Sequence, residues 1–179
     1  MVIYLDLEMN GLRGRNGYII EIGAIKSIKG KVVDKFESFV KLPSYMEGVH
    51  PFITVLTGIR DNDLDDAKEY YEILTEFIKW CSQAEAIYCF GDADIASIGY
   101  TALKQDKQNK KCIKNAFKFS KCLIDIREMV LIVKPELFNK SLFDIYRILL
   151  KKEIDEKKAH RTIYDSMILK EVHEKLKEY

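Results

Sequence analysis

The stretch Val2-Ile3-Tyr4-Leu5-Asp6-Leu7-Glu8-Met9-Asn10, near the N-terminus, decides the fold of this 179-residue chain. It begins as an apolar run with β-branched and aromatic residues, which is typical of a buried strand. Successive side chains of a strand point to opposite faces. Asp6 and Glu8 are therefore predicted to lie side by side, while Leu5 and Leu7 face a core. Repulsion between two such carboxylates is offset by a divalent cation that prefers oxygen ligands, although a solvated edge strand remains the alternative.

The composition is that of an ordinary α/β protein, with 47% hydrophobic and 32% charged residues and only nine glycines and three prolines. The length suits one domain, which we expect to span residues 1–179. The net charge of +1 means that nucleic-acid binding depends on local clusters of basic residues. We expect a cytoplasmic protein without membrane contact, because no signal-peptide pattern, long apolar run or C-x-x-C cysteine pair is present.

The remaining elements predict a mixed sheet with helices on both faces. A Gly-rich connection carrying Arg13 and Arg15 leads from the first strand to a hairpin. The hairpin strands are expected over residues 18–25 and 32–42, and residues 43–63 are expected to be irregular. The pattern then predicts a helix over 65–80 capped by Asp65 or Asp66, a strand over 86–90, a helix to 103, a strand over 122–125, and helices near 127–133, 142–150 and 161–179.

Further acidic residues stand where the chain is expected to leave the sheet or enter a helix. Asp94 follows the strand that ends at Phe90, with Asp92 as its competitor, and helix capping is the alternative role for either. His160 and Asp165 are five residues apart, so they meet only if His160 lies at the helix entrance and reaches back. There, the helix N-terminus disfavours a cationic imidazole and nearby carboxylates favour it, which suits a general base.

The alternative for this pair is a surface histidine and a solvated aspartate. We assign no chemical role to His50 or to His173, which stand in a loop and in a charged terminal helix respectively.

Taken together, these motifs resemble the DEDDh family of 3′–5′ exonucleases, which includes proofreading and ribonuclease T-like enzymes. The matching segments are YLDLEMNG with Asp6 and Glu8, CFGDADIASI with Asp94, AHRTIYDS with His160 and Asp165, and ITVLTGI over residues 53–59. The family's middle motif, Trp-Gly-x-x-Asp, favours Asp94 over Asp92. The motif style is most similar to Eri1-like RNA exonucleases. The departures are Met9 for Thr, Phe90 for Trp, and Thr162 and Ser166 where Ala is common.

The resemblance implies an α/β, ribonuclease H-like fold with a mixed five-stranded sheet and helices on both faces. It also implies two divalent metal ions, Mg2+ or Mn2+, held by Asp6, Glu8, Asp94 and Asp165, with His160 as the base that activates water. Met9, Asn10 and Leu56 are then candidates to hold the terminal nucleotide. The expected reaction is hydrolysis of single-stranded nucleic acid, with RNA favoured, from the 3′ end to nucleoside 5′-monophosphates.

Several alternatives remain at this point. The same chemistry could act on DNA, as in a proofreading or repair exonuclease, since no contact to a 2′-hydroxyl can be identified. A non-catalytic nucleic-acid-binding or regulatory module and an unrelated Mg2+ phosphohydrolase are the others. The lysine-rich stretch 104–121 is either a track for the nucleic-acid backbone or a solvated loop. The sequence carries no signal for an oligomeric state.

Overall fold

The computed structural model describes residues 1–11, 17–105 and 107–179, so the predicted connection with Arg13 and Arg15 lies outside the described residues. The strands are β1 (Val2–Asn10), β2 (Tyr18–Ile28), β3 (Lys31–Phe39), β4 (Ala86–Cys89) and β5 (Leu123–Asp125). The helices are α1 (Pro51–Thr57), α2 (Asp61–Leu64), α3 (Tyr70–Trp80), α4 (Asp92–Gln105), α5 (Lys110–Ser120), α6 (Ile126–Val133), the 3-10 turn η2 (Pro135–Leu137), α7 (Leu142–Leu150) and α8 (Thr162–Leu176).

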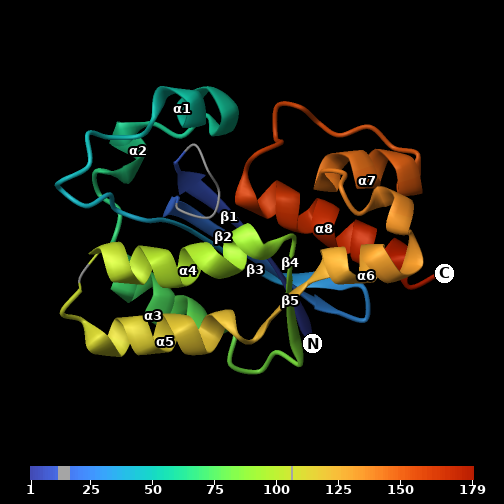
Figure 1. The fold of residues 1–179 in the computed structure, drawn as a ribbon, viewed down its shortest axis with the longest axis horizontal. Helices are drawn as coiled ribbons and strands as arrows, with labels where there is room; N and C mark the ends of the chain where they lie inside the picture. Colours follow the sequence, from blue (N-terminus) through green and yellow to red (C-terminus); the bar gives the residue numbers. More distant parts are fainter. Residues whose placement is uncertain (12–16, 106) are drawn as a thin grey trace.

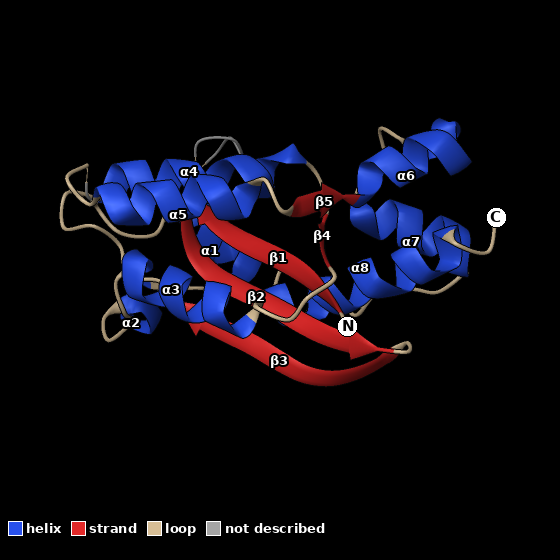
Figure 2. Cartoon of the chain, turned by 90° about the horizontal axis from the view of Figure 1, so that it is seen from below, coloured by secondary structure: helices blue, strands red, loops and turns tan. Residues whose placement is uncertain are grey.

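The five strands form one mixed sheet in the order β3-β2-β1-β4-β5 (Figures 1 and 2). β1 and β2 pair antiparallel, as do β2 and β3, whereas β4 runs parallel to β1 and β5 runs parallel to β4. The expected mixed five-stranded sheet is confirmed, and β3 and β5 are its edge strands. Parallel neighbours place the ends of β1 and β4 at the same edge of the sheet, where the chain leaves toward α4.

The two faces of β1 serve two different cores, as its alternating pattern predicts. Ile3, Leu5 and Leu7 are buried in a cluster that includes residues of α3, α4 and α5. Tyr4 belongs to a second cluster, with residues of α6, α7 and α8. Helices therefore cover both faces of the sheet (Figure 2), as expected, and β1 is the strand at the centre of both cores.

The prediction of an irregular segment over residues 43–63 was wrong, because α1 and α2 lie within it. α1 has clear boundary signals: the His50 side chain accepts a hydrogen bond from the Phe52 N–H, Pro51 opens the helix, and Gly58 ends it with φ of +78°. Proline at the first position and glycine just past the end are the usual asymmetry of helix boundaries. The helix is only seven residues long, too short for a recognisable hydrophobic period.

Two further expectations need correction. The helix predicted from residue 65 begins at Tyr70, with Glu69 rather than Asp65 or Asp66 as its cap, in a reciprocal capping box with Glu72. The lysine-rich stretch contains α5, which Asn109 caps through the Cys112 N–H, so the loop alternative is wrong for residues 110–120.

The four cysteines form no disulfide within the described residues, and Cys81, Cys89 and Cys112 are buried. Among the described residues, no helix has the length and apolar character required to cross a membrane.

Candidate active site

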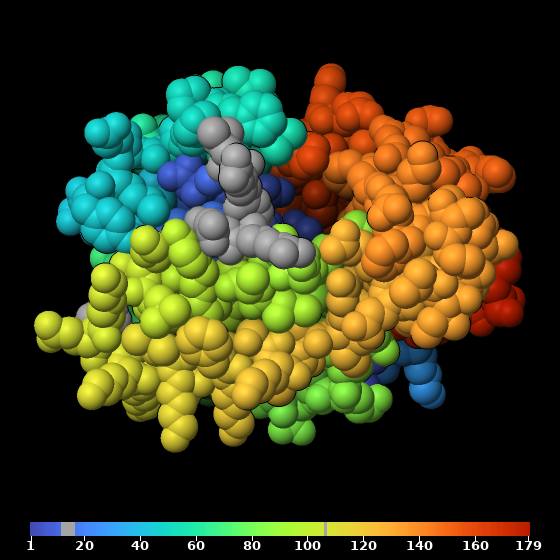
Figure 3. Space-filling view, viewed as in Figure 1, coloured from blue at the N-terminus to red at the C-terminus, as the bar shows by residue number. Residues whose placement is uncertain are grey.

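Three segments that are far apart in sequence meet at one end of the sheet. They are the second half of β1, the first turn of α4 and the first turn of α8 (Figure 1). In the space-filling view the surface is hollowed where blue β1 emerges between α1, α4 and α8 (Figure 3). The hollow therefore lies where the sequence motifs predicted that the acidic side chains would converge.

α8 reaches the sheet because β2 has a glycine at the crossing. A Cβ added at Gly23 would lie 2.0 Å from Thr162 Oγ1, so no other residue fits there without moving the helix. Thr162 and Ser166 are fully buried, and the Ser166 hydroxyl donates to the Gly23 carbonyl oxygen at 3.3 Å. Gly23 also pairs with Asp6 across the sheet. The close approach at Gly23 thus sets the first turn of α8 beside the acidic residues of β1.

His160 lies at the entrance of α8, as its convergence with Asp165 requires. Its backbone adopts the left-handed conformation, with φ of +60°, a region that histidine visits more readily than most residues. Its backbone N–H donates to the Asp165 carboxylate. The ring of Phe143 on α7 packs edge-on against the imidazole, with 5.2 Å between the ring centroids. Ligand atoms of Glu8, His160 and Asp165 all lie within 4.8 Å of one another. The predicted convergence of His160 and Asp165 is confirmed.

The carboxylates of this cluster are held in an environment that opposes their ionisation. Burial raises the pKa of Asp94 to about 8 and that of Asp165 to about 7, although a backbone hydrogen bond lowers each. Burial likewise raises the pKa of Asp6 and of Glu8 well above the usual range, and the neighbouring carboxylates raise both further. Mutual repulsion in a poorly solvated place makes the cluster unfavourable without added positive charge.

The imidazole of His160 is itself a poor source of that charge. Burial lowers the pKa of His160, against a smaller opposing effect of Glu156. A neutral imidazole carries a free nitrogen lone pair, which suits proton abstraction. From the sequence, the helix N-terminus was expected to lower the pKa of His160 and the nearby acids to raise it. In the structure, partial burial of the ring is the main cause of the lowered pKa.

The side-chain arrangement fits divalent cations. Asp165 Oδ1 is buried and has no hydrogen-bond partner among the described residues, which is uncommon in folded proteins. Carboxylate oxygens are the ligands that Mg2+ and Mn2+ prefer, and Glu8, His160 and Asp165 form a group able to hold a metal ion. The orphaned oxygen, the donor chemistry and the uncompensated negative charge all favour metal binding here.

Asp94 and Asp92 occupy the same turn of α4 but have different environments. Asp94 is 6% exposed and close enough to Asp6 to raise its pKa. The side chain of Asp92 is 53% exposed and pairs with Arg127 at 3.4 Å. Gly91 makes the turn from β4 into α4 with φ of +98°, a conformation that favours glycine. The geometry therefore places Asp94, and not Asp92, with the cluster.

A further buried acid, Glu21, was not predicted from the sequence. Glu21 on β2 is fully buried and stands opposite Glu8 in the sheet register. Arg161 grips its carboxylate through Nη2 at 2.6 Å and Nε at 3.2 Å, and the Thr162 N–H donates to it at 3.2 Å. An acidic residue inside the apolar run Tyr18–Ile25 was the available signal, because buried carboxylates require a partner. This ion pair fixes Arg161, which lies between His160 and the first residue of α8, to β2 of the sheet.

The predicted nucleotide-binding residues lie around the same hollow. Met9, at a bulge in β1, accepts a hydrogen bond from the Ser97 hydroxyl through its sulfur at 2.6 Å. The Asn10 side chain donates to the Gly48 carbonyl oxygen at 2.9 Å and accepts from the His50 N–H at 2.7 Å. Leu56 on α1 is 38% exposed. Asn10 thus ties the end of β1 to the segment that carries α1.

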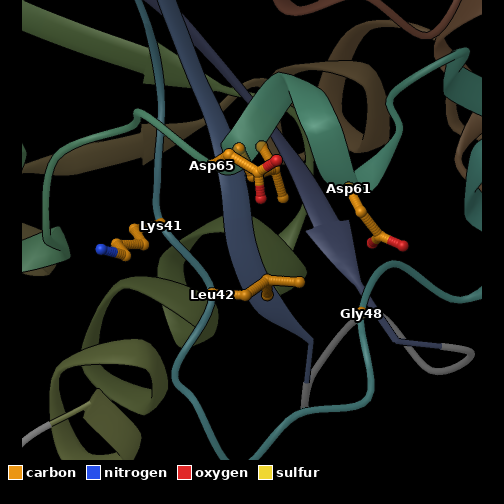
Figure 4. Close-up of a pocket in the computed structure, with 6 residues that line it drawn as sticks. Lys41, Leu42, Gly48, Asp61 and Asp65 are labelled. Carbon is orange, nitrogen blue, oxygen red and sulfur yellow. The ribbon is translucent and has the colours of Figure 1, made fainter.

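That segment is braced from its other side at a pocket of about 150 Å³ (Figure 4). Asp61 points toward the backbone at Gly48, and its Oδ1 accepts from the Val49 N–H at 2.6 Å. Asp61 therefore helps to hold the chain near Asn10 in place, because its carboxylate already accepts a hydrogen bond from the backbone.

The two remaining histidines lie outside the cluster. His50 caps α1, and His173 is buried on α8, where its Nδ1 shares a hydrogen bond with the Tyr4 hydroxyl at 2.9 Å. Burial lowers the pKa of His173 to about 4. The first contact caps a helix, and the second joins α8 to β1.

Comparison with known proteins gives matches along nearly the whole chain. A family model described as "RNase_T: Exonuclease" matches residues 3–173. A DNA polymerase III PolC-type of Caldanaerobacter subterraneus subsp. tengcongensis is 30% identical over 171 residues, covering 94% of this chain and 12% of the relative. The corresponding protein of Bacillus subtilis is 26% identical over 166 residues, covering 92% of this chain and 10% of the relative. The chain therefore spans only about a tenth of these relatives.

Solved structures show the same fold at lower sequence identity. A 3′-exonuclease that recognises a histone mRNA stem-loop superposes with a TM-score of 0.79 at 17% identity, covering 99% of this chain and 63% of that one. Exonuclease X in complex with 5′-overhanging duplex DNA gives 0.64 at 16% identity, covering 99% and 92%. These likenesses confirm the expected ribonuclease H-like exonuclease fold.

Proposed function

The chain belongs to the ribonuclease T-like, DEDDh family of 3′–5′ exonucleases, and we propose that it removes nucleotides from the 3′ end of single-stranded nucleic acid. We propose further that residues 1–179 form one exonuclease domain and that two divalent ions, Mg2+ or Mn2+, act in the reaction. The products are nucleoside 5′-monophosphates.

The convergence of His160 and the carboxylates from three separate elements carries this proposal. Glu8, His160 and Asp165 offer ligand atoms within 4.8 Å of one another, and Asp94 is close enough to Asp6 to raise the pKa of Asp6. A merely structural cluster would have its charges paired, whereas Asp165 Oδ1 is buried without a hydrogen-bond partner among the described residues. Such an arrangement is suited to a function that supplies positive charge from outside the chain.

The side chains have two roles in this proposal. Asp6, Glu8, Asp94 and Asp165 would hold the ions. Divalent ions held there would supply a more acidic water and positive charge near the phosphoryl oxygens and the leaving 3′ oxygen. His160 takes the proton of the attacking water, since its half-buried imidazole has a lowered pKa and stays neutral near pH 7.

The terminal nucleotide is held by the rim of the hollow. The exposed edge of Leu56 and the backbone near Met9 offer contacts to its base and sugar, and stacking against apolar groups tolerates any base. Asn10 positions this rim through its bonds to Gly48 and His50.

RNA and DNA are both candidate substrates. The likeness of the motifs to Eri1-like enzymes favours RNA, and the neighbour at TM-score 0.79 recognises a histone mRNA stem-loop. DNA is the second candidate, because the relative at 30% identity is a DNA polymerase III PolC-type. Discrimination between the two requires a contact to the 2′-hydroxyl.

The test is a time course on matched 5′-labelled single-stranded RNA and DNA oligonucleotides with Mn2+, Mg2+ or EDTA. Wild type is compared with Asp6→Asn and with the control Asp92→Asn, which neutralises an exposed acid on α4. We expect a metal-dependent ladder that shortens from the 3′ end in wild type and the control, and none with Asp6→Asn.

The ratio of the RNA and DNA rates decides between the two substrates. Degradation of neither by folded wild type with metal present would contradict the exonuclease proposal and favour a nucleic-acid-binding or regulatory module. Equal activity of Asp6→Asn would contradict the assigned site.

A further inference from the structure

The most strongly charged segment of the chain lies outside the active site. Residues 104–121 contain seven lysines and one aspartate, a formal charge of +6, so the rest of the chain carries −5 to give the total of +1. The lysines are exposed and lie at positions 104, 107, 110, 111, 114, 118 and 121. The nearly neutral net charge of the whole chain therefore gives no indication of this local cluster of positive charge.

α5 and its C-cap residue arrange four of these lysines as one face of a helix. Lys110, Lys114, Lys118 and Lys121 follow at spacings of four, four and three residues, so they are neighbours along one side. The opposite side of α5 is buried, through Cys112, Ala116, Phe119 and Ser120. The face is roughly 16 Å long at 1.5 Å per residue. We call this face, together with the nearby Lys104 on α4, Lys107 before α5 and Lys111, the α5 basic face.

The α5 basic face is not neutralised within the described part of the chain. Other exposed lysines have acidic partners, such as Lys68 with Glu76 at 2.6 Å and Lys152 with Glu171 at 2.8 Å. Within the described ranges, none of the seven lysines takes part in any of the ion pairs found. Like charges at this helical spacing repel one another and destabilise a helix. A polyanion would relieve that repulsion.

The face is connected to the active site by α4. α4 starts with Asp94 in the site, and α5 returns alongside it, with Phe117 Cε1 only 2.9 Å from the position of a Cβ at Gly99 (Figures 1 and 2). Packed helices lie about 8–10 Å apart, and α4 is roughly 21 Å long. In Figure 3 the yellow side chains of this region project away from the hollow. The face is therefore separated from the site by the width of α4, so only a strand longer than the few nucleotides in the hollow could reach it.

We propose that the α5 basic face is a second nucleic-acid contact, which binds the phosphate backbone of the substrate upstream of its 3′ nucleotide. This inference rests on the proposed exonuclease function, because that function brings a polyanion to the adjacent site. Lysines spread along a helix act as point charges without a base preference. The contact thus holds long substrates of any sequence and leaves hydrolysis of the smallest substrates unchanged.

The test compares two triple variants of equal charge change. Lys110→Gln, Lys114→Gln and Lys118→Gln remove the centre of the face. Lys31→Gln, Lys35→Gln and Lys79→Gln remove exposed lysines of β3 and α3 that likewise take part in none of the described ion pairs. Fluorescence anisotropy with a 5′-labelled 30-nucleotide single strand in EDTA gives the affinity at several salt concentrations without cleavage. Hydrolysis of the p-nitrophenyl ester of thymidine 5′-monophosphate with Mn2+ reports on the active site alone.

We expect the α5 variant to bind the oligonucleotide roughly 10- to 100-fold more weakly at 50 mM salt. The slope of log affinity against log salt should fall by about 2, because each lost phosphate contact removes about 0.7. The control variant should bind like wild type, and all three proteins should hydrolyse the ester equally.

Wild-type affinity and slope in the α5 variant would overturn the proposal. So would an equal loss in the control, which would indicate a general charge effect, or a loss of ester hydrolysis, which would place the lysines at the active site. Loss of binding to phosphatidylserine vesicles with unchanged oligonucleotide binding would instead assign the face to a membrane. If wild type hydrolyses neither ester nor oligonucleotide, the exonuclease proposal fails, while the binding comparison still decides the role of α5.

Discussion

Glu8 and Glu21 stand opposite each other on β1 and β2, and both are buried. Glu21 is compensated within the chain by Arg161 and the Thr162 N–H. Burial raises the pKa of Glu8, and Asp165, Glu21 and Asp94 raise it further, while Arg161 lowers it. Burial also raises the pKa of Asp6, as do Asp165, Asp94 and Glu8. Glu21 thus has a cation bonded directly to it within the chain, whereas the acids of the proposed site take part in none of the described ion pairs.

The largest effect is expected from His160, the basic group among the acids of the proposed site. His160→Ala should lower the single-turnover rate on a 5′-labelled oligonucleotide by about 10²–10⁴-fold, as for loss of a general base. The four carboxylates remain, so calorimetric titration should show a smaller effect on Mn2+ binding than on the rate. Full activity of His160→Ala across the pH range would contradict the assigned base.

The Glu21–Arg161 ion pair should stabilise the folded protein, unlike the uncompensated acids Asp6, Glu8, Asp94 and Asp165. Arg161→Met leaves Glu21 buried and unpaired, which costs about 2–4 kcal/mol of unfolding free energy. We place this below the cost for a fully buried pair because the Arg161 side chain is 39% exposed. Urea denaturation measures the change.

The double variant Glu21→Met with Arg161→Met is the matched control, because replacing both partners removes the unpaired charge. It should recover most of the lost stability. A double variant as unstable as Arg161→Met alone would show that the ion pair is not the cause.

A smaller effect of opposite sign is expected from Asp94. Its folded pKa of about 8 lies above the usual value of 3.8. Its contribution to the stability of the metal-free protein is therefore fully present below about pH 3.8 and is lost as pH rises through about 8. Asp94→Asn should raise the unfolding free energy in EDTA by about 0.5–2 kcal/mol at pH 8.5 and have a smaller effect at pH 5, where much of the contribution remains.

Asp92→Asn is the control for Asp94, since it neutralises an exposed acid two residues away. It removes the pair with Arg127 and should change stability by less than about 1 kcal/mol at either pH. Equal responses of Asp92→Asn and Asp94→Asn to pH would contradict the difference in their environments.

The comparison also explains what the sequence could predict. Alternating apolar and acidic residues on β1 predicted both faces of the strand from local periodicity. The resemblance to the family's middle motif favoured Asp94 over Asp92, and Asp94 is the buried one of the two. The Glu21–Arg161 pair joins residues 140 apart in the chain, and Gly23 matters only because α8 crosses there. Neither contact produces a local pattern in the sequence. The Glu21–Arg161 pair was therefore not predicted, whereas the acids of β1, α4 and α8 were expected to lie together.

Helix boundaries show the same limit on a smaller scale. α1 is a single short helix whose signals are a histidine cap, a proline and a glycine, each of which is also common in loops. The left-handed backbone of His160 was likewise implied only by the requirement that it reach Asp165. Tertiary contacts decide both conformations.

The most direct test of the account is the stability of Asp6→Asn against wild type at pH 8, measured by urea denaturation in EDTA and in saturating Mn2+. The account predicts a reversal. Asp6→Asn should be the more stable protein in EDTA, because it relieves repulsion among buried acids. Wild type should be the more stable in Mn2+, since a ligand at 100 times its Kd adds about 2.7 kcal/mol. A variant that is less stable in EDTA and gains as much from Mn2+ as wild type would contradict an acidic cluster left open for metal ions.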